Sequence, residues 1–164
     1  MIAGVDFDSF AVYIAALPFE REHEAARARF TTIRFREKKE SGADEAFAAA
    51  LRLPRRLAFE LGPTPAAAWI ERPMSEQRKH LVTMGRVQGL IVATLLDLGV
   101  EVIEEVTPQE WKLAVAGKGY GNAKKAAVHE HLARLWPAEL PADENMRDAL
   151  AIAWTAREEN ARGR

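Results

Sequence analysis

Short apolar runs alternate with turn-forming or basic residues in the first part of the chain, which is the pattern of β-strands. Two of these runs flank the turn residues Asp8 and Ser9 and predict a hairpin. A third contains RFTTIRFR, in which aromatic and aliphatic side chains alternate with basic ones. A fourth ends in a carboxylate and predicts a buried central strand. The five predicted strands cover residues 2–7, 10–17, 27–36, 66–71 and 100–106.

Between and after these runs, apolar residues recur at helical spacing. The first helical segment is disturbed by Pro54, and the second ends at Gly99. Thr107 and Pro108 follow the last strand as an expected helix N-cap and first helical residue. These first two helical segments cover residues 44–61 and 77–98. Further helices are predicted over residues 123–135 and 145–162. The pattern predicts an α/β fold, a mixed sheet with helices on its faces, in a single domain of residues 1–164.

Composition narrows the setting in which this domain works. The chain has 164 residues, enough for one domain with a substantial core. It has no cysteine, which excludes disulfides and a cysteine-ligated zinc site. Its apolar stretches are too short to span a bilayer, and its first residues do not resemble a signal peptide. We therefore expect a cytoplasmic protein that does not associate with membranes.

The charge distribution carries more information than the net charge of -1, which gives no overall attraction to nucleic acid. Residues 112–125 contain four lysines and no acid, and residues 27–56 are also rich in basic side chains, diluted by acids. Either these segments are ordinary solvated faces, or they are local phosphate-binding surfaces on a balanced protein.

Three carboxylates stand in apolar surroundings, where an acid is costly to bury. Asp6 lies within the first strand, Glu71 closes AAAWIE, and Asp148 opens the small apolar stretch DALAIAW. Each has an ordinary explanation when taken alone. Asp6 could be exposed near a strand end, and Glu71 could pair with Arg72. Asp148 could stabilise the first turn of a helix through the helix dipole.

Taken together, three such carboxylates on two strands and one helix favour a metal site. Divalent cations such as Mg²⁺ prefer oxygen ligands and combine a few carboxylates with water and phosphate oxygens. Two ions about 3.5–4 Å apart stabilise both the attacking water and the leaving oxygen in phosphodiester hydrolysis. The pattern therefore indicates a metal-dependent phosphodiesterase.

Five segments carry a more specific pattern: IAGVDFDS (2–9), AWIERP (68–73), MGRVQGLI (84–91), WKLAVAG with GYGNAKKAAV (111–128), and DALAIA (148–153). The fourth is the most specific, because it matches a spacing of Gly-x-Gly-x-Ala-x-Lys-x-x-Val. Together they resemble the RuvC family of Holliday junction resolvases along nearly the whole chain. The resemblance identifies a divergent or phage-type member of that family.

The resemblance implies an RNase H-like fold and an endonuclease that cuts four-way or other branched DNA in recombination and repair. It places catalytic and metal-binding roles on Asp6, Glu71 and Asp148. It places basic functional roles on Lys112 and Lys125, with Lys125 acting in catalysis. It further implies Mg²⁺, with Mn²⁺ able to substitute, two ions per site, a homodimer, no nucleotide cofactor, and action in a bacterial or phage-infected cytoplasm.

The chain departs from the family pattern at three places. The family's fourth acidic position is occupied here by Asn145, so either its carbonyl or the neighbouring Glu144 completes the metal site. Met74 stands where the family often has an aromatic wedge shortly after the catalytic glutamate. A short insertion surrounds Lys118, and its glycines would let Lys118 and Lys124 approach DNA phosphates.

Other features have both an ordinary and a functional interpretation. Gly85 and Gly89 are spaced for close packing, either on the sheet of the same chain, which we expect, or on a second subunit. The four tryptophans are expected mostly in the core, with Trp111 the one considered for DNA contact. The histidines at positions 80, 129 and 131 lack zinc-site spacing and are expected at the surface.

Two other functions remain open from the sequence. One is an RNase H-like nuclease acting on another structured nucleic acid, such as a flap, a fork or folded RNA. The other is a catalytically weak junction-binding protein, suggested by the missing carboxylate at Asn145. The fold alone does not decide among these functions.

Overall fold

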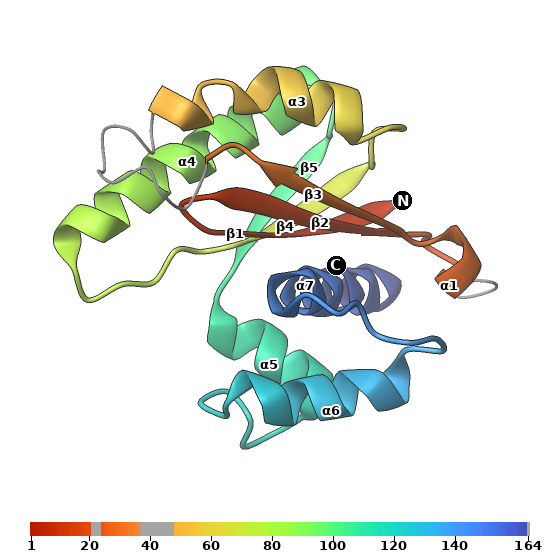
Figure 1. Ribbon diagram of the computed structural model, residues 1–164. Coiled ribbons are helices and arrows are strands. Elements are labelled where there is room, and N and C mark those ends of the chain that lie inside the picture. The colour runs from red at the N-terminus through yellow and green to blue at the C-terminus, as the bar shows by residue number, and fades with distance from the viewer. Residues whose placement is uncertain (21–23, 37–47, 164) are drawn as a thin grey trace.

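The computed structural model describes residues 1–20, 24–36 and 48–163. Its centre is a five-stranded mixed sheet in the order β3-β2-β1-β4-β5 (Figure 1). The antiparallel part comprises β1 (Ile2–Phe7), β2 (Ala11–Leu17) and β3 (Arg29–Arg34). The parallel part continues from β1 through β4 (Ala67–Glu71) to β5 (Val102–Val106). The sheet has the mixed character expected from the sequence.

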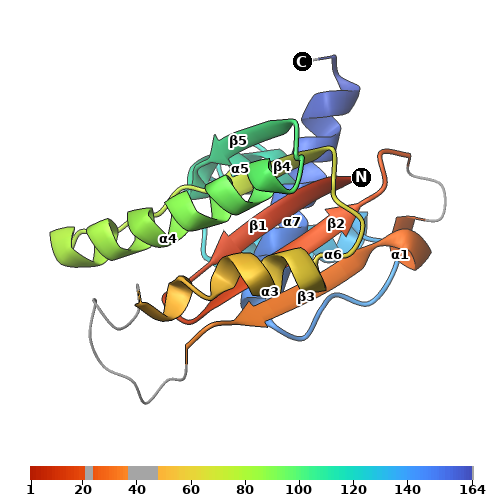
Figure 2. The ribbon, with the colours of Figure 1, turned by 90° about the horizontal axis from the view of Figure 1, so that it is seen from above.

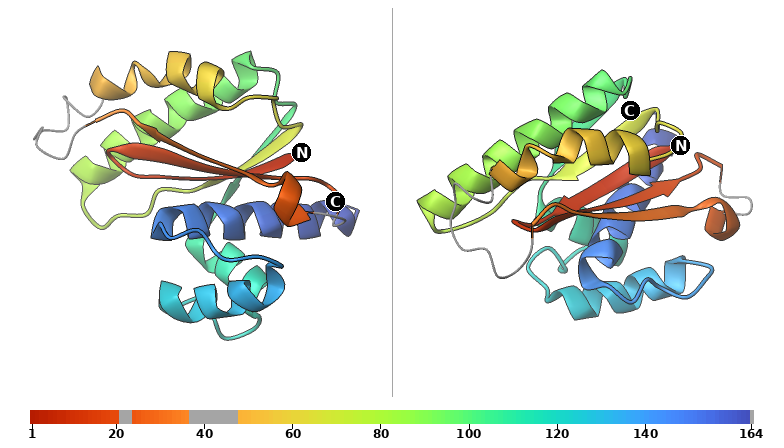
Figure 3. Two further views of the ribbon diagram at one scale, coloured as in Figure 1. Left: turned by 45° about the vertical axis from the view of Figure 1, so that its right-hand side comes forward. Right: turned by 45° about the horizontal axis from the view of Figure 1, so that its top comes forward.

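Helices cover both faces of the sheet. The helices α3 (Leu53–Glu60) and α4 (Arg78–Asp97) lie on one face, and α7 (Glu144–Ala161) lies on the other (Figures 1 and 2). The helices α5 (Pro108–Ala116) and α6 (Lys125–Leu135) lie beyond α7, as both views in Figure 3 show. A short α1 (Glu24–Arg27) precedes β3. The fold is therefore layered, with α7 directly beneath the central strand.

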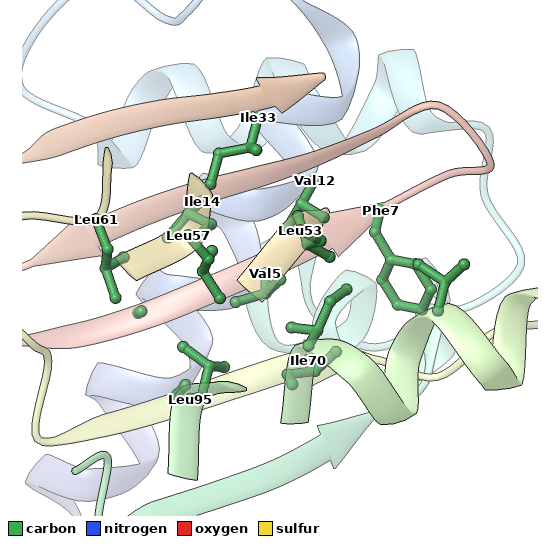
Figure 4. Close-up of a cluster of buried hydrophobic side chains, with 14 of the residues drawn as sticks. Val5, Phe7, Val12, Ile14, Ile33, Leu53, Leu57, Leu61, Ile70 and Leu95 are labelled. Carbon is green, nitrogen blue, oxygen red and sulfur yellow. The ribbon is translucent and has the colours of Figure 1, made fainter. Parts of the chain in front are cut away.

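Strand β1 is buried on both faces because the two sets of alternating side chains enter two different cores. Ala3, Val5 and Phe7 join the cluster under α3 and α4, part of which is drawn in Figure 4. Ile2 joins the cluster between the sheet and α7. Asp6 is on the same face as Ile2, so the strand directs its carboxylate toward α7.

Close packing of α7 on β1 depends on Gly4. A side chain at this position would overlap the backbone of Ala149 and Ala153. Because glycine lacks a side chain, α7 lies directly against the strand. This approach sets the distance between the acid on β1 and the acid on α7.

The predicted strands and most of the predicted helices are present, with boundaries shifted by a few residues. The continuous helix predicted over residues 44–61 is wrong in its described part, because a turn at residues 51–52 interrupts it and α3 begins at Leu53. The hairpin around Asp8 is formed, and Thr107 is the N-cap of α5, in a capping box with Glu110. Pro54 occupies the first turn of α3, and residues 44–47 of the longer helix predicted there lie outside the described residues. Among the described residues, no helix has the length and apolar character needed to cross a bilayer.

Candidate metal centre

Two of the three carboxylates come from adjacent parallel strands. The register pairs Val5 of β1 with Ile70 of β4, so Asp6 and Glu71 follow side by side at the carboxyl ends of the strands. Residues paired across two neighbouring strands point to the same face of the sheet, and the two strands lie about 4.8 Å apart. The sheet therefore brings these two acids together although 65 positions separate them in the sequence.

The third carboxylate is on α7. Asp148 is fully buried, and both of its oxygens have partners on α6. His129 Nε2 donates to Asp148 Oδ1 at 2.8 Å, and Lys125 Nζ donates to Asp148 Oδ2. The ordinary explanation of Asp148 as a first-turn acid is wrong, because α7 begins at Glu144 and Asp148 lies in its second turn. Its burial and its two cationic or polar partners fix the position of the carboxylate.

The three acids interact electrostatically. Burial raises the pKa of Asp6 well above its ordinary value of 3.8, and the charges of Glu71 and Asp148 raise it further. Burial is also the main cause of the raised pKa of Glu71, to which Asp148 adds. Burial works to lower the pKa of Lys125, but Asp148, Asp6 and Glu71 outweigh it and the pKa is raised. The site therefore concentrates negative charge that the ammonium groups of Lys125 and Lys112 only partly offset.

Trp111 fixes the orientation of Glu71. Its indole Nε1 donates to Glu71 Oε2 at 2.7 Å, and the indole ring is completely buried under the site. The proposed alternative pairing of Glu71 with Arg72 is wrong, because Arg72 instead pairs with Glu105 at 3.0 Å. The expectation that Trp111 could contact DNA is also wrong, since a buried indole is inaccessible to DNA.

A cavity of about 250 Å³ opens over Asp6 and Glu71. Its lining includes Asp6, Asp8, Glu71, Lys125 and Asn145, with Met74 and His80 among its other residues. The lining is therefore mixed, with charged and polar side chains beside apolar ones, and the cavity is open to solvent. Its size suits a phosphate group with bound ions and water rather than a large organic ligand.

The donor set fits hard divalent cations. Buried carboxylates with raised pKa values are stabilised by a nearby cation, and carboxylate oxygens are the ligands that Mg²⁺ prefers. As the side chains lie, no three His, Asp or Glu residues of the described ranges surround a single point. Lys125 and His129 occupy the oxygens of Asp148. Mg²⁺ commonly uses only one or two carboxylates and retains water, so Asp6 and Glu71 would be the primary ligands.

The two candidates for the fourth ligand differ in position. Asn145 lines the cavity, whereas the side chain of Glu144 is 66% exposed and its Oε1 lies 3.9 Å from Lys125 Nζ. The amide of Asn145 donates to Asp8 Oδ2 at 3.5 Å. Asn145 therefore has the inherited location, but its amide NH₂ group is directed toward another acid. We had not expected Asp8 at the site, because the sequence pattern explained it as a turn residue.

The remaining basic and apolar candidates lie around the site in different settings. Lys112 Nζ donates to the carbonyl of Ala123 at 3.0 Å and so ties α5 to the loop before α6. Lys118 and Lys124 are exposed on that loop and at the start of α6. Met74 is 61% exposed at the cavity. Lys112 therefore has a structural contact, whereas the side chains of Lys118, Lys124 and Met74 are accessible to solvent.

His129 is a residue that sequence reasoning misplaced. It was expected at the surface, but it is 5% exposed and hydrogen-bonded to Asp148. His131 is half-buried, with its ring against Tyr120. The usable signal was the spacing of His129 four residues after Lys125, which puts both on one face of α6. Two polar side chains on one face of a mostly apolar helix indicate a shared buried partner.

Comparison with known proteins relates part of this chain to proteins named RuvC. No family model matches the chain. Curated relatives named "Crossover junction endodeoxyribonuclease RuvC" include those of Thermotoga petrophila, 34% identical over 74 residues, and Chlorobaculum parvum, 42% identical over 77 residues. These alignments cover 44% and 46% of this chain, and 43% and 40% of the relatives. The chain therefore matches less than half the length of these curated relatives.

The structural likeness extends further. Thermus thermophilus RuvC in complex with a Holliday junction substrate has a TM-score of 0.70 and 23% identity, covering 96% of this chain and 95% of that one. A second Thermus thermophilus RuvC structure has a TM-score of 0.68, 22% identity and coverage of 98% and 95%. These likenesses show that the chain has the RNase H-like fold of RuvC, as expected from the sequence.

Proposed function

We propose that this chain, which is related to RuvC, is a metal-dependent endonuclease that cuts four-way or other branched DNA. The observation that carries the proposal is that Asp6, Glu71 and Lys125 line one cavity, while the buried Asp148 binds Lys125 and interacts electrostatically with both acids. An arrangement that concentrates buried negative charge destabilises the fold unless it binds cations. The relatives' names and the fold supply the substrate class.

Each residue has a distinct part in this reaction. Asp6 and Glu71 would hold Mg²⁺ or Mn²⁺, with two ions per site, and Trp111 and His129 orient the carboxylates. The bound ions would supply Lewis acidity, lowering the pKa of the attacking water and offsetting charge on the phosphate. Lys125 would turn from Asp148 to the scissile phosphate and donate hydrogen bonds to its oxygens as charge builds up.

The test of this proposal is cleavage of a synthetic four-way junction with Mg²⁺ or Mn²⁺, compared with linear duplex, fork, flap and folded RNA. We expect paired nicks in the junction that require the metal and little cutting of the duplex. Preferential cutting of a flap, a fork or RNA would retain the metal-dependent nuclease reaction and change the assigned substrate. Junction binding without cleavage in either metal would overturn the endonuclease assignment.

Lys125 is expected to act mainly on rate. Replacing it with alanine removes the cation beside the scissile phosphate, so single-turnover cleavage at saturating junction should fall about a hundredfold. The matched control is Lys124→Ala at the exposed start of α6. It should cut normally once saturated, but flatten the plot of log K against log salt by about 0.9. Normal saturated cleavage by Lys125→Ala with much weaker binding would reverse the two roles.

The outward face of α4 supports the homodimer that a two-fold junction requires. Among the described residues, nothing lies within 4 Å of a methyl group placed on Gly85 or Gly89, so the expected packing of these glycines on the chain's own sheet is wrong. Val82, 48% exposed, and Leu96, 55% exposed, lie on the same stripe. Among the described residues, the stripe is therefore apolar and exposed, and we expect it to pack against the same helix of a second chain.

Introducing a charge into this stripe should separate the subunits. Val82→Glu is expected to shift the mass measured by light scattering from dimer to monomer, and to convert paired nicks into single ones. Leu135→Glu is the control, because Leu135 is similarly exposed, at 41%, but lies on α6. A Val82→Glu protein that remains dimeric would place the interface elsewhere.

A further inference from the structure

Asn145 stands between two side chains of the β1–β2 hairpin. Its amide lies 3.5 Å from Asp8 Oδ2, and it shares a hydrogen bond with the phenol of Tyr13. Tyr13 is in turn the cross-strand partner of Asp6. The residue at the family's fourth acidic position is thus connected to the strand that carries the first acid.

Asp8 is placed to act as a ligand just beyond that strand. It directly follows β1, two residues after Asp6, and both side chains line the cavity. Its Oδ1 accepts from the backbone amides of Phe10 at 2.6 Å and Ala11 at 2.8 Å. These two bonds fix the carboxylate, and the other oxygen, Oδ2, is the one beside Asn145. One oxygen therefore anchors the turn while the second remains at the cavity.

The identities of the two residues are complementary. An aspartate at position 145 would place a second negative charge next to Asp8, whereas asparagine offers a hydrogen-bond donor. With Asp8 counted beside Asp6 and Glu71 in the cavity and Asp148 behind Lys125, the site would have four carboxylates despite the asparagine at position 145. We propose that Asp8 is the fourth carboxylate of the metal site and that Asn145 positions it. This inference rests on the proposed function, because it assigns a ligand to the same metal centre.

Asparagine at position 8 separates the ligand role from the turn role. The amide oxygen of Asp8→Asn can still accept from Phe10 and Ala11, so the hairpin is retained while the charge is lost. Asp97→Asn is the matched control. It makes the same chemical change at an exposed position on α4, about 20 Å along the helix from Met84 at the cavity.

The experiment is calorimetric titration of the purified protein with Mn²⁺, without DNA. Asp8→Asn should weaken Mn²⁺ binding by about tenfold or more, and Asp97→Asn should leave it unchanged. Adding Asn145→Asp to Asp8→Asn should restore the Mn²⁺ affinity, because the pair of side chains at positions 8 and 145 then again contains one carboxylate. Thermal unfolding in EDTA checks that each variant is folded.

The outcomes separate this inference from the function. Mn²⁺ affinity of Asp8→Asn equal to that of the wild type would overturn the role of Asp8, even if the wild type cuts junctions. If the double variant Asp8→Asn/Asn145→Asp did not recover the Mn²⁺ affinity, the inference that Asp8 replaces a carboxylate at position 145 would be overturned. Tight Mn²⁺ binding that depends on Asp8, in a wild type that cuts no junction, would sustain the ligand and reject the endonuclease. Absence of saturable Mn²⁺ binding by the wild type would overturn both.

Discussion

Replacing Asp6 with asparagine is expected to abolish DNA cleavage while leaving junction binding nearly intact. Asp6 is the most central acid, interacting with both Glu71 and Asp148. A bound metal contributes several kcal/mol to the transition state, and each 1.36 kcal/mol is worth tenfold in rate. We therefore expect a loss of at least about a thousandfold in single-turnover cleavage. Binding depends mainly on phosphate contacts made by exposed basic residues, so the dissociation constant should change little.

The same substitution should stabilise the metal-free protein at neutral pH. The pKa of Asp6 is raised in the fold, so its ionised form costs stability as pH rises from 3.8 through the raised pKa. Asparagine removes this cost, and its amide oxygen can keep the bond from the Phe7 amide. Tm in EDTA should therefore rise at neutral pH and converge with the wild type near pH 3.8.

Asp97→Asn serves again as the control, with unchanged cleavage and no comparable gain in Tm. Wild-type cleavage by Asp6→Asn would place the metal site elsewhere. A drop in Tm at neutral pH would show that the Asp6 carboxylate stabilises the metal-free fold, contrary to the electrostatic argument. Rate and stability thus test the site independently.

The strands and the main acids were accessible from the sequence because they depend on local patterns. The apolar, β-prone run of residues 2–7 predicts a strand, and a carboxylate within that run indicates a ligand. Asp6 and Glu71 meet because parallel strands end at the same edge, which the order of elements already indicates. These features require no knowledge of long-range packing.

The hydrogen bonds that hold the acidic side chains in place could not be predicted from local sequence patterns. The bond from Trp111 to Glu71 joins residues 40 apart in sequence, and that from His129 to Asp148 joins residues 19 apart. Such contacts depend on how α5 and α6 pack beyond α7, which hydrophobic periodicity does not encode. Asp8 is a different case, because a turn role alone explains it in the sequence, and its contact with Asn145 joins residues 137 apart.

Gly4→Ala is expected to damage both stability and activity, since it acts on the contact that joins the acids. The added methyl group would overlap the backbone oxygen of Ala149 and the backbone nitrogen of Ala153, and would lie 2.9 Å from Ala153 Cα. Helix α7 would have to move away from β1 by about an ångström to restore normal contact. Overpacking of this kind typically costs 1–3 kcal/mol, and we expect about 3 because backbone atoms cannot rotate aside. Urea unfolding at neutral pH measures this loss.

The movement of α7 would also carry Asp148 away from Asp6, and a misplacement of about 1 Å can cost a hundredfold in rate. Cleavage should therefore fall about a hundredfold even at temperatures where circular dichroism shows the variant folded. Gly121→Ala is the control, because its methyl group would make ordinary contact with Leu113 at 3.4 Å and should change stability by less than about 0.5 kcal/mol. Trimming Ala149 to glycine should not rescue Gly4→Ala, since the overlap is with the Ala149 carbonyl oxygen rather than its side chain. Rescue by that double variant, or an unchanged urea midpoint in Gly4→Ala, would show that α7 does not press on β1 at this position.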